Sequence, residues 1–128
     1  MNQPEPPALD VSFLLHAAER LPGDPQVDDL GPLFAAVARV QAHAMDRDVY
    51  GSVHLKAAAL LHTLVRLPSL EHSGGPFAWA SCEAYLALHG ITLDYPPKNA
   101  VALVRDTASG TTGVAQITRE LRAWTQAG

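Results

Sequence analysis

The sequence VHLKAAALLHTLVR runs from Val53 to Arg66. Its apolar residues cover almost every side of a helix instead of one stripe, a pattern typical of a helix that is surrounded by other helices. We therefore expect a buried helix over 53–66 at the centre of the domain.

Helical periodicity predicts further helices on both sides of this segment. Upstream, Asp10 is expected to cap a first helix that ends near Leu21. Ile91–Tyr95 is predicted to be a short extended piece, because Pro96 disfavours helical backbone at the residue before it. The other predicted helices run from about Pro32 to Ala44, from Pro76 to the break at Gly90, from about Lys98 to Asp106, and from Gly113 to Thr125 after an N-cap at Thr112.

These segments predict one all-α domain, a bundle of about six helices without a sheet. A chain of 128 residues fits a single domain, and a composition of 48% hydrophobic and 17% charged residues is that of a globular protein. We place the domain at residues 10–128. Residues 1–9 contain three prolines and no periodicity, and they are expected to form a disordered lead-in.

Charge and composition exclude several classes of partner. A net charge of −4 leaves no excess of Lys and Arg for phosphates, so we expect no nucleic-acid partner. No segment resembles a signal peptide or a membrane span, and we expect no membrane partner and a cytoplasmic location. Cys82 is the only cysteine, which excludes an internal disulfide and a Cys-rich zinc site.

Several runs of the sequence resemble the Doc branch of the Fic family. These are VYGSVHLKAAALLHTLVR (49–66), FAWASCEAYLALHG (77–90) and ITRELRAW (117–124), and the earlier run AAERLPGDPQVDDLGPLFAAVARVQAHAM (17–45) is similar too. The similarity covers nearly the whole chain after residue 9. It implies an all-helical Fic/Doc-like domain related to toxins that modify proteins with ATP.

The same resemblance implies an active-site loop between the central helix and the next one. Relatives carry there a signature of the form His-x-apolar-x-acid-Gly/Ala-Asn-Gly/Lys-Arg. In register with Gly90, the equivalent residues here are Pro68 at the histidine, Leu70 at the apolar position, His72 at the acid, Ser73, Gly74 at the asparagine, Gly75, and Pro76 at the arginine. Only Leu70 is retained in kind.

In the family, the histidine is the general base, the acid holds Mg²⁺, and the asparagine and basic residues bind phosphates. Those roles need a base that titrates near neutral pH, a hard oxygen ligand and donors for negative charge. None of these groups is supplied at the equivalent positions here, which are Pro68, His72, Gly74 and Pro76. The sequence thus predicts a degenerate loop with no catalytic residue, no metal and no cofactor.

The loop residues also suggest a metal site, a serine nucleophile or an anion site. His72 with His62 would be a metal pair without the third ligand that zinc needs. Ser69 or Ser73 would need a base in contact, and the adjacency of His72 to Ser73 along the chain does not place the side chains together. The backbone N–H groups near Ser73, Gly74 and Gly75 are a candidate anion-binding site at a helix start, although we favour the alternative that the loop has drifted and binds no ligand.

Three functions are compatible with these observations. We favour a catalytically degenerate Fic/Doc-like protein that acts by binding a protein partner: an antitoxin-like peptide, an active homologue or a target protein. The alternatives are an active transferase that moves phosphate or adenylate from ATP to a protein, and a Fic fold adapted to an unrelated ligand or reaction. The sequence does not specify an oligomeric state.

Overall fold

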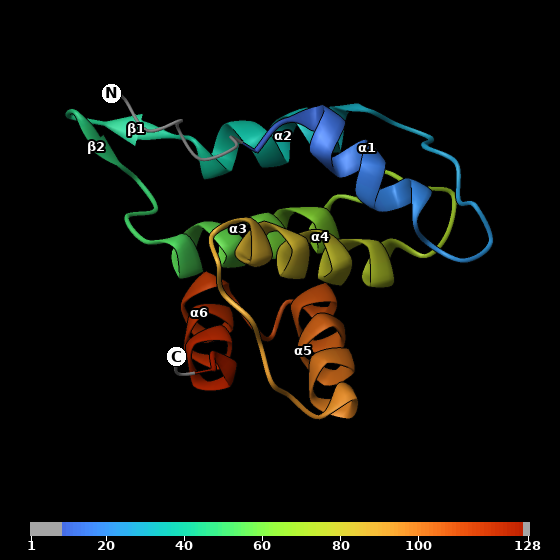
Figure 1. Cartoon of the computed structure of the whole chain (residues 1–128). Helices are drawn as coiled ribbons and strands as arrows, with labels where there is room; N and C mark the ends of the chain where they lie inside the picture. Colours follow the sequence, from blue (N-terminus) through green and yellow to red (C-terminus); the bar gives the residue numbers. More distant parts are fainter. Residues whose placement is uncertain (1–8, 127–128) are drawn as a thin grey trace, which may run out of the picture.

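The computed structural model describes residues 9–126, which form six α-helices and one small antiparallel sheet (Figure 1). The helices are α1 (Val11–Glu19), α2 (Gly31–Val40), α3 (Val53–Arg66), α4 (Gly74–Leu88), α5 (Pro97–Ser109) and α6 (Val114–Trp124), and the strands are β1 (His43–Ala44) and β2 (Arg47–Asp48). The predicted all-α class is confirmed. Across the described residues, none of the helices has the length and apolar character that spanning a membrane requires.

The helices form three layers, with α3 and α4 in the middle (Figure 1). The pair α1 and α2 lies on one side of this layer, and α5 and α6 lie on the other. Helix α3 packs against α2, α4, α5 and α6, as the even distribution of its apolar residues predicted. The central position of the 53–66 helix is therefore confirmed.

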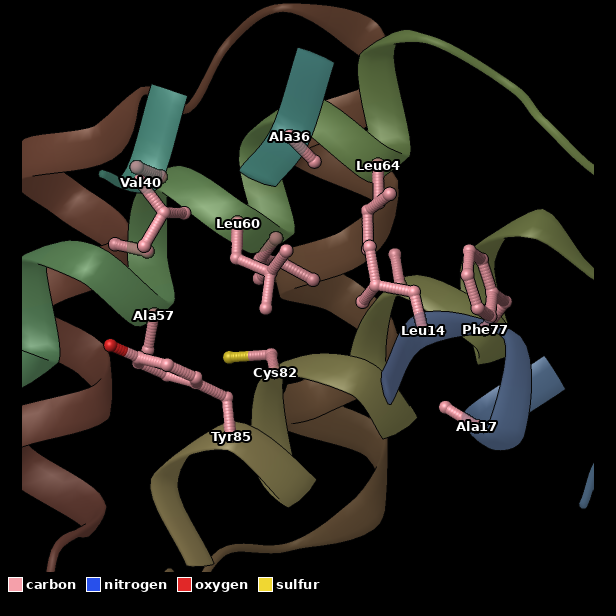
Figure 2. Close-up of a cluster of buried hydrophobic side chains, with 14 of the residues drawn as sticks. Leu14, Ala17, Ala36, Val40, Ala57, Leu60, Leu64, Phe77, Cys82 and Tyr85 are labelled. Carbon is pink, nitrogen blue, oxygen red and sulfur yellow. The ribbon is translucent and has the colours of Figure 1, made fainter. Parts of the chain in front are cut away.

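The core lies along α3 and extends into the helices around it. Leu60 and Leu61 are fully buried, as are Phe77 and Cys82 from α4. Figure 2 shows how side chains of α1, α2 and α4 meet those of α3 in this cluster. Burial raises the pKa of the Cys82 thiol far above its usual range, which keeps it protonated.

Two predicted helix ends are confirmed by their geometry. The Asp10 carboxylate accepts the N–H of Phe13 at 2.8 Å, as an N-cap residue does. Gly90 follows α4 with a φ of +75°, a left-handed conformation that glycine adopts without Cβ strain. Gln41 Nε2 donates to the carbonyl of Leu9, and Leu9 is buried, so the packed part of the chain includes this residue of the predicted lead-in. The remainder of that lead-in, residues 1–8, lies outside the described residues.

The prediction of a chain without a sheet was wrong for residues 43–48. Helix α2 ends at Val40 instead of Ala44, and β1 and β2 form a hairpin whose turn residues Met45 and Asp46 have φ values of 54° and 63°. The His43 ring lies 2.8 Å from the carboxylate of Asp48 across the hairpin. This segment is polar and exposed, so continuing the helix would have buried no apolar surface.

Other helix ends shift by a few residues. Helix α4 begins at Gly74, because Pro76 fits within a first turn whose N–H groups need no helical acceptor. Helix α5 is longer than predicted and reaches Ser109, and Gly113 instead of Thr112 is the N-cap of α6. The expected extended piece near Leu93 is present as a single bridge to Thr125.

Candidate functional site

The loop between α3 and α4 is held in place by its backbone. The carbonyl of Ser69 accepts the N–H groups of Asp28 and Asp29 at 2.8 and 3.2 Å, and Val27 forms an antiparallel bridge with Leu70. Leu70 is 7% exposed and belongs to the core. Leu70, which the predicted match to the family's signature retains in kind, is thus a packing residue.

The next residues along the loop form a chain of polar contacts. Gln26 and Glu71 are joined twice: the Glu71 N–H donates to the Gln26 carbonyl at 3.0 Å, and the Gln26 N–H donates to Glu71 Oε1 at 3.1 Å. The same Oε1 lies 3.6 Å from Nε2 of His72. His72 Nδ1 lies 2.8 Å from Oγ of Ser73. The expectation that the side chains of His72 and Ser73 do not meet was therefore wrong.

Ser73 has an unusual backbone at the start of α4. Its φ of 65° and ψ of 27° are left-handed, a conformation that costs a residue with a Cβ roughly 1–2 kcal/mol. Its side chain does not cap the helix. The following Gly74 and Gly75 N–H groups belong to the first turn, where an α-helix supplies no acceptor, and Pro76 has no N–H.

A groove of about 390 Å³ lies between α5 and the first turns of α4. Trp79 Nε1 donates to the Tyr95 hydroxyl at 2.9 Å, and that hydroxyl donates to Glu83 at 2.8 Å. Burial raises the pKa of Tyr95, so its hydroxyl keeps the proton that it donates. The groove is lined by Gly75, Pro76, Trp79, Tyr95, Pro97, Ala100, Val101 and Val104. None of these side chains carries a charge.

The residues present do not fit Mg²⁺ and a nucleoside triphosphate. Glu71 provides the carboxylate of the loop between α3 and α4. Its Oε1 already accepts the N–H of Gln26 and faces His72. The lining of the groove offers a triphosphate no basic side chain for charge-assisted bonds. Within residues 9–126, no group of three metal-ligating side chains occurs.

The two histidines considered as a metal pair have separate partners. His62 Nδ1 contacts the Arg39 guanidinium at 2.7 Å, and the same guanidinium donates to the Tyr50 hydroxyl. Burial lowers the pKa of His62, and the positive charges of Arg39 and Arg66 lower it further. His72 is instead joined to Ser73 and faces Glu71. Ser69 is buried, and its hydroxyl has no partner among the described residues.

Two features of the site were not found from the sequence. Glu71 was not singled out, because its pairing with Gln26 joins positions 45 residues apart. The groove was missed because half of its lining comes from α5, where Ala100, Val101 and Val104 follow ordinary helical spacing. No local pattern distinguishes such residues from core positions.

Comparison with known proteins places this architecture in a family. The chain is 35% identical over 107 residues to a protein named Toxin Doc from Mycolicibacterium smegmatis, and the match covers 82% of each chain. No protein-family model matches the sequence. Identity at this level over most of both chains shows that this protein belongs to the Doc family of toxins. The resemblance predicted from the sequence is therefore confirmed at the level of the family.

Proposed function

We propose that this protein is a catalytically degenerate Doc-like protein that transfers nothing from ATP and acts by binding a protein partner. One observation carries the proposal: the groove beside the motif loop is lined without a charged side chain. Apolar side chains of a protein suit such a groove, whereas a triphosphate needs basic groups and a metal.

The motif loop supports the loss of transfer chemistry. Pro68 has neither a base nor an N–H, and His72 offers no carboxylate at the position where relatives hold Mg²⁺. Gly75 and Pro76 have replaced the basic residues. A barrier lowered by a base, a metal and phosphate-binding groups together is not overcome when all three are lost.

The relative's name supports a protein partner. A toxin of a toxin–antitoxin pair is held inactive by a second protein, so an antitoxin-like peptide is the first partner to test, followed by an active homologue or a target protein. Val101 is 65% exposed at the edge of the groove and offers apolar surface to such a partner.

The backbone donors at the head of α4 are proposed to retain only weak affinity for anions. The positive end of a helix contributes about 0.3–1 kcal/mol toward an exposed anion. Sulfate or phosphate would thus bind at Ser73, Gly74 and Gly75 only at high concentration. We expect ATP with Mg²⁺ to bind more weakly than about 1 mM, equivalent to ~4 kcal/mol.

Loss of transfer is tested with ATP labelled on either the α- or the γ-phosphate. The purified full chain is incubated with labelled ATP, Mg²⁺ and bacterial extract, and labelled proteins are separated by electrophoresis. We expect no labelled band above a reaction without the protein. A band that disappears in a His72→Ala variant would contradict the proposal.

Binding is tested by calorimetry with an antitoxin-like peptide as the partner. Val101→Asp places a charge at the groove, and Val49→Asp is the matched control, because Val49 is 52% exposed and does not line the groove. We expect Val101→Asp to weaken binding at least tenfold and Val49→Asp to leave it unchanged. Equal effects of both variants on the affinity would show that the partner does not bind at the groove.

A further inference from the structure

We propose that Ser73, His72 and Glu71 form a serine-nucleophile site that hydrolyses esters of small apolar acids. This activity goes beyond the proposed protein binding and is independent of it. It uses residues of the loop from which, in the proposed function, the transfer chemistry of the family is missing.

The order of the three side chains is that of a nucleophile, its base and an orienting acid. Ser73 Oγ lies 2.8 Å from His72 Nδ1, within the range over which a base removes a proton. Glu71 Oε1 lies 3.6 Å from His72 Nε2, at the opposite side of the ring. This distance is longer than a hydrogen bond, and such contacts commonly shorten when substrate binds. The carboxylate favours the tautomer with its proton on Nε2, which leaves Nδ1 free to accept.

The acid and the base are positioned by the segment that precedes α2. Two hydrogen bonds between Gln26 and Glu71 hold both the backbone and the carboxylate of the acid. A Cβ on Gly23 would lie 3.5 Å from Cε1 of the His72 ring, so the ring lies close against this turn. These contacts do not depend on the helix that follows Ser73.

The backbone of Ser73 supports a functional role for its hydroxyl. Left-handed conformations of residues other than glycine are strained and occur preferentially at functional sites. Glycine would relieve this strain at Ser73, yet the chain has serine there and glycine at the next two positions.

Gly74 and Gly75 supply donors for a developing negative charge. Their N–H groups are the first two of α4, where no helical acceptor exists and where the helix dipole favours an anion. Two backbone N–H groups beside a nucleophile form the kind of site that stabilises the oxyanion of acyl transfer.

The adjacent groove indicates the class of substrate. Its lining begins at Gly75, two residues after the nucleophile, and it consists of apolar and aromatic side chains. A cavity of about 390 Å³ accommodates a short acyl chain or an aryl group. An acid with its own charge is disfavoured, because none of the lining residues carries a countercharge.

The reaction uses only the ester and water. Ser73 Oγ attacks the carbonyl carbon while its proton moves to His72 Nδ1, and the carbonyl oxygen becomes the oxyanion. The bond to the leaving alcohol then breaks, and His72 returns the proton to the alcohol oxygen. Water attacks the acyl-serine, giving its proton to His72, and the carboxylic acid leaves as that proton returns to Ser73 Oγ.

The experiment measures hydrolysis of 4-nitrophenyl butyrate by the full chain and labelling by an alkyl fluorophosphonate, with the labelled residue identified by mass spectrometry. Ser73→Gly removes the hydroxyl and keeps a residue that suits the left-handed backbone, so this variant retains the fold. Ser109→Ala is the control, because Ser109 is exposed and bonds only to the end of α5 and Thr111.

We expect the label on Ser73, and a loss in kcat/KM of at least ~100-fold in Ser73→Gly and in His72→Ala. Glu71→Gln is expected to lose ~10-fold, and Ser109→Ala to be unchanged. Hydrolysis by the native protein no faster than by Ser73→Gly, or labelling that persists in His72→Ala, would overturn the site. Neither assay contains ATP or a partner protein, so a negative result here does not bear on the proposed function. Failure of the proposed function likewise does not bear on ester hydrolysis at Ser73.

Discussion

Replacing Leu61 by alanine tests whether α3 is the structural centre of this domain. The Leu61 side chain is fully buried in a helix that contacts four others. Truncation removes about three carbon groups at ~0.8 kcal/mol each, or roughly 2.4 kcal/mol of apolar burial. The remaining cavity brings the expected loss of unfolding free energy to ~2–5 kcal/mol. At about 4 °C per kcal/mol for a domain of this size, the Tm falls by roughly 8–20 °C.

Leu67→Ala is the matched control for this measurement. Leu67 follows the last residue of the same helix and is 46% exposed, so its truncation opens no closed cavity. We expect a loss below about 1 kcal/mol. Urea unfolding followed by circular dichroism at 222 nm gives both values. A loss for Leu61→Ala no larger than that for Leu67→Ala would refute the central position of α3.

Other predictions concern pH, thiol reactivity and toxicity. Burial lowers the pKa of His54 and His62 below 6.5, so the folded state binds fewer protons than the unfolded state. The Tm should therefore fall as the pH decreases below about 6.5, and replacing both histidines with Gln should reduce this dependence of the Tm on pH. The buried Cys82 thiol should react with a disulfide reagent only when the protein is unfolded in urea. A reaction rate in the folded protein equal to that in the unfolded protein would contradict this prediction. Induced expression of the protein should not arrest growth, because the family resemblance ties growth arrest to transfer from ATP and we propose that this transfer is lost. Growth arrest that persists when residues 68–75 are replaced by a neutral linker would instead indicate toxicity through the helical surface.

Much of the fold could be predicted from local patterns. The even apolar distribution over 53–66 predicted its central position, and Asp10 and Gly90 marked real helix ends because capping depends on only a few neighbouring residues. The hairpin at 43–48 was missed. Its turn uses Met45 and Asp46 in left-handed conformations, and methionine carries no signal for such a turn.

The candidate site was less predictable, because it depends on contacts between distant segments. The match of the loop to the family's signature stays a prediction. The geometry of His72 and Ser73 depends on Glu71, and that residue is positioned by Gln26. Hydrogen bonds of this kind leave no periodicity in the sequence. The apolar spacing of α5 likewise did not distinguish groove residues from core residues.

The loop between α3 and α4 is anchored by contacts that need no reactive side chain. The anchoring contacts are the backbone of Ser69, the burial of Leu70 and the backbone pairing of Glu71 with Gln26. None of these contacts needs a histidine, an acid or an asparagine at the family's signature positions. The residues at Pro68, His72 and Gly74 therefore remove no support of the loop, as the proposed loss of transfer chemistry requires. Both of our proposals for this loop, the loss of transfer from ATP and the presence of a different set of reacting groups, require this independence of the anchoring contacts from the signature residues.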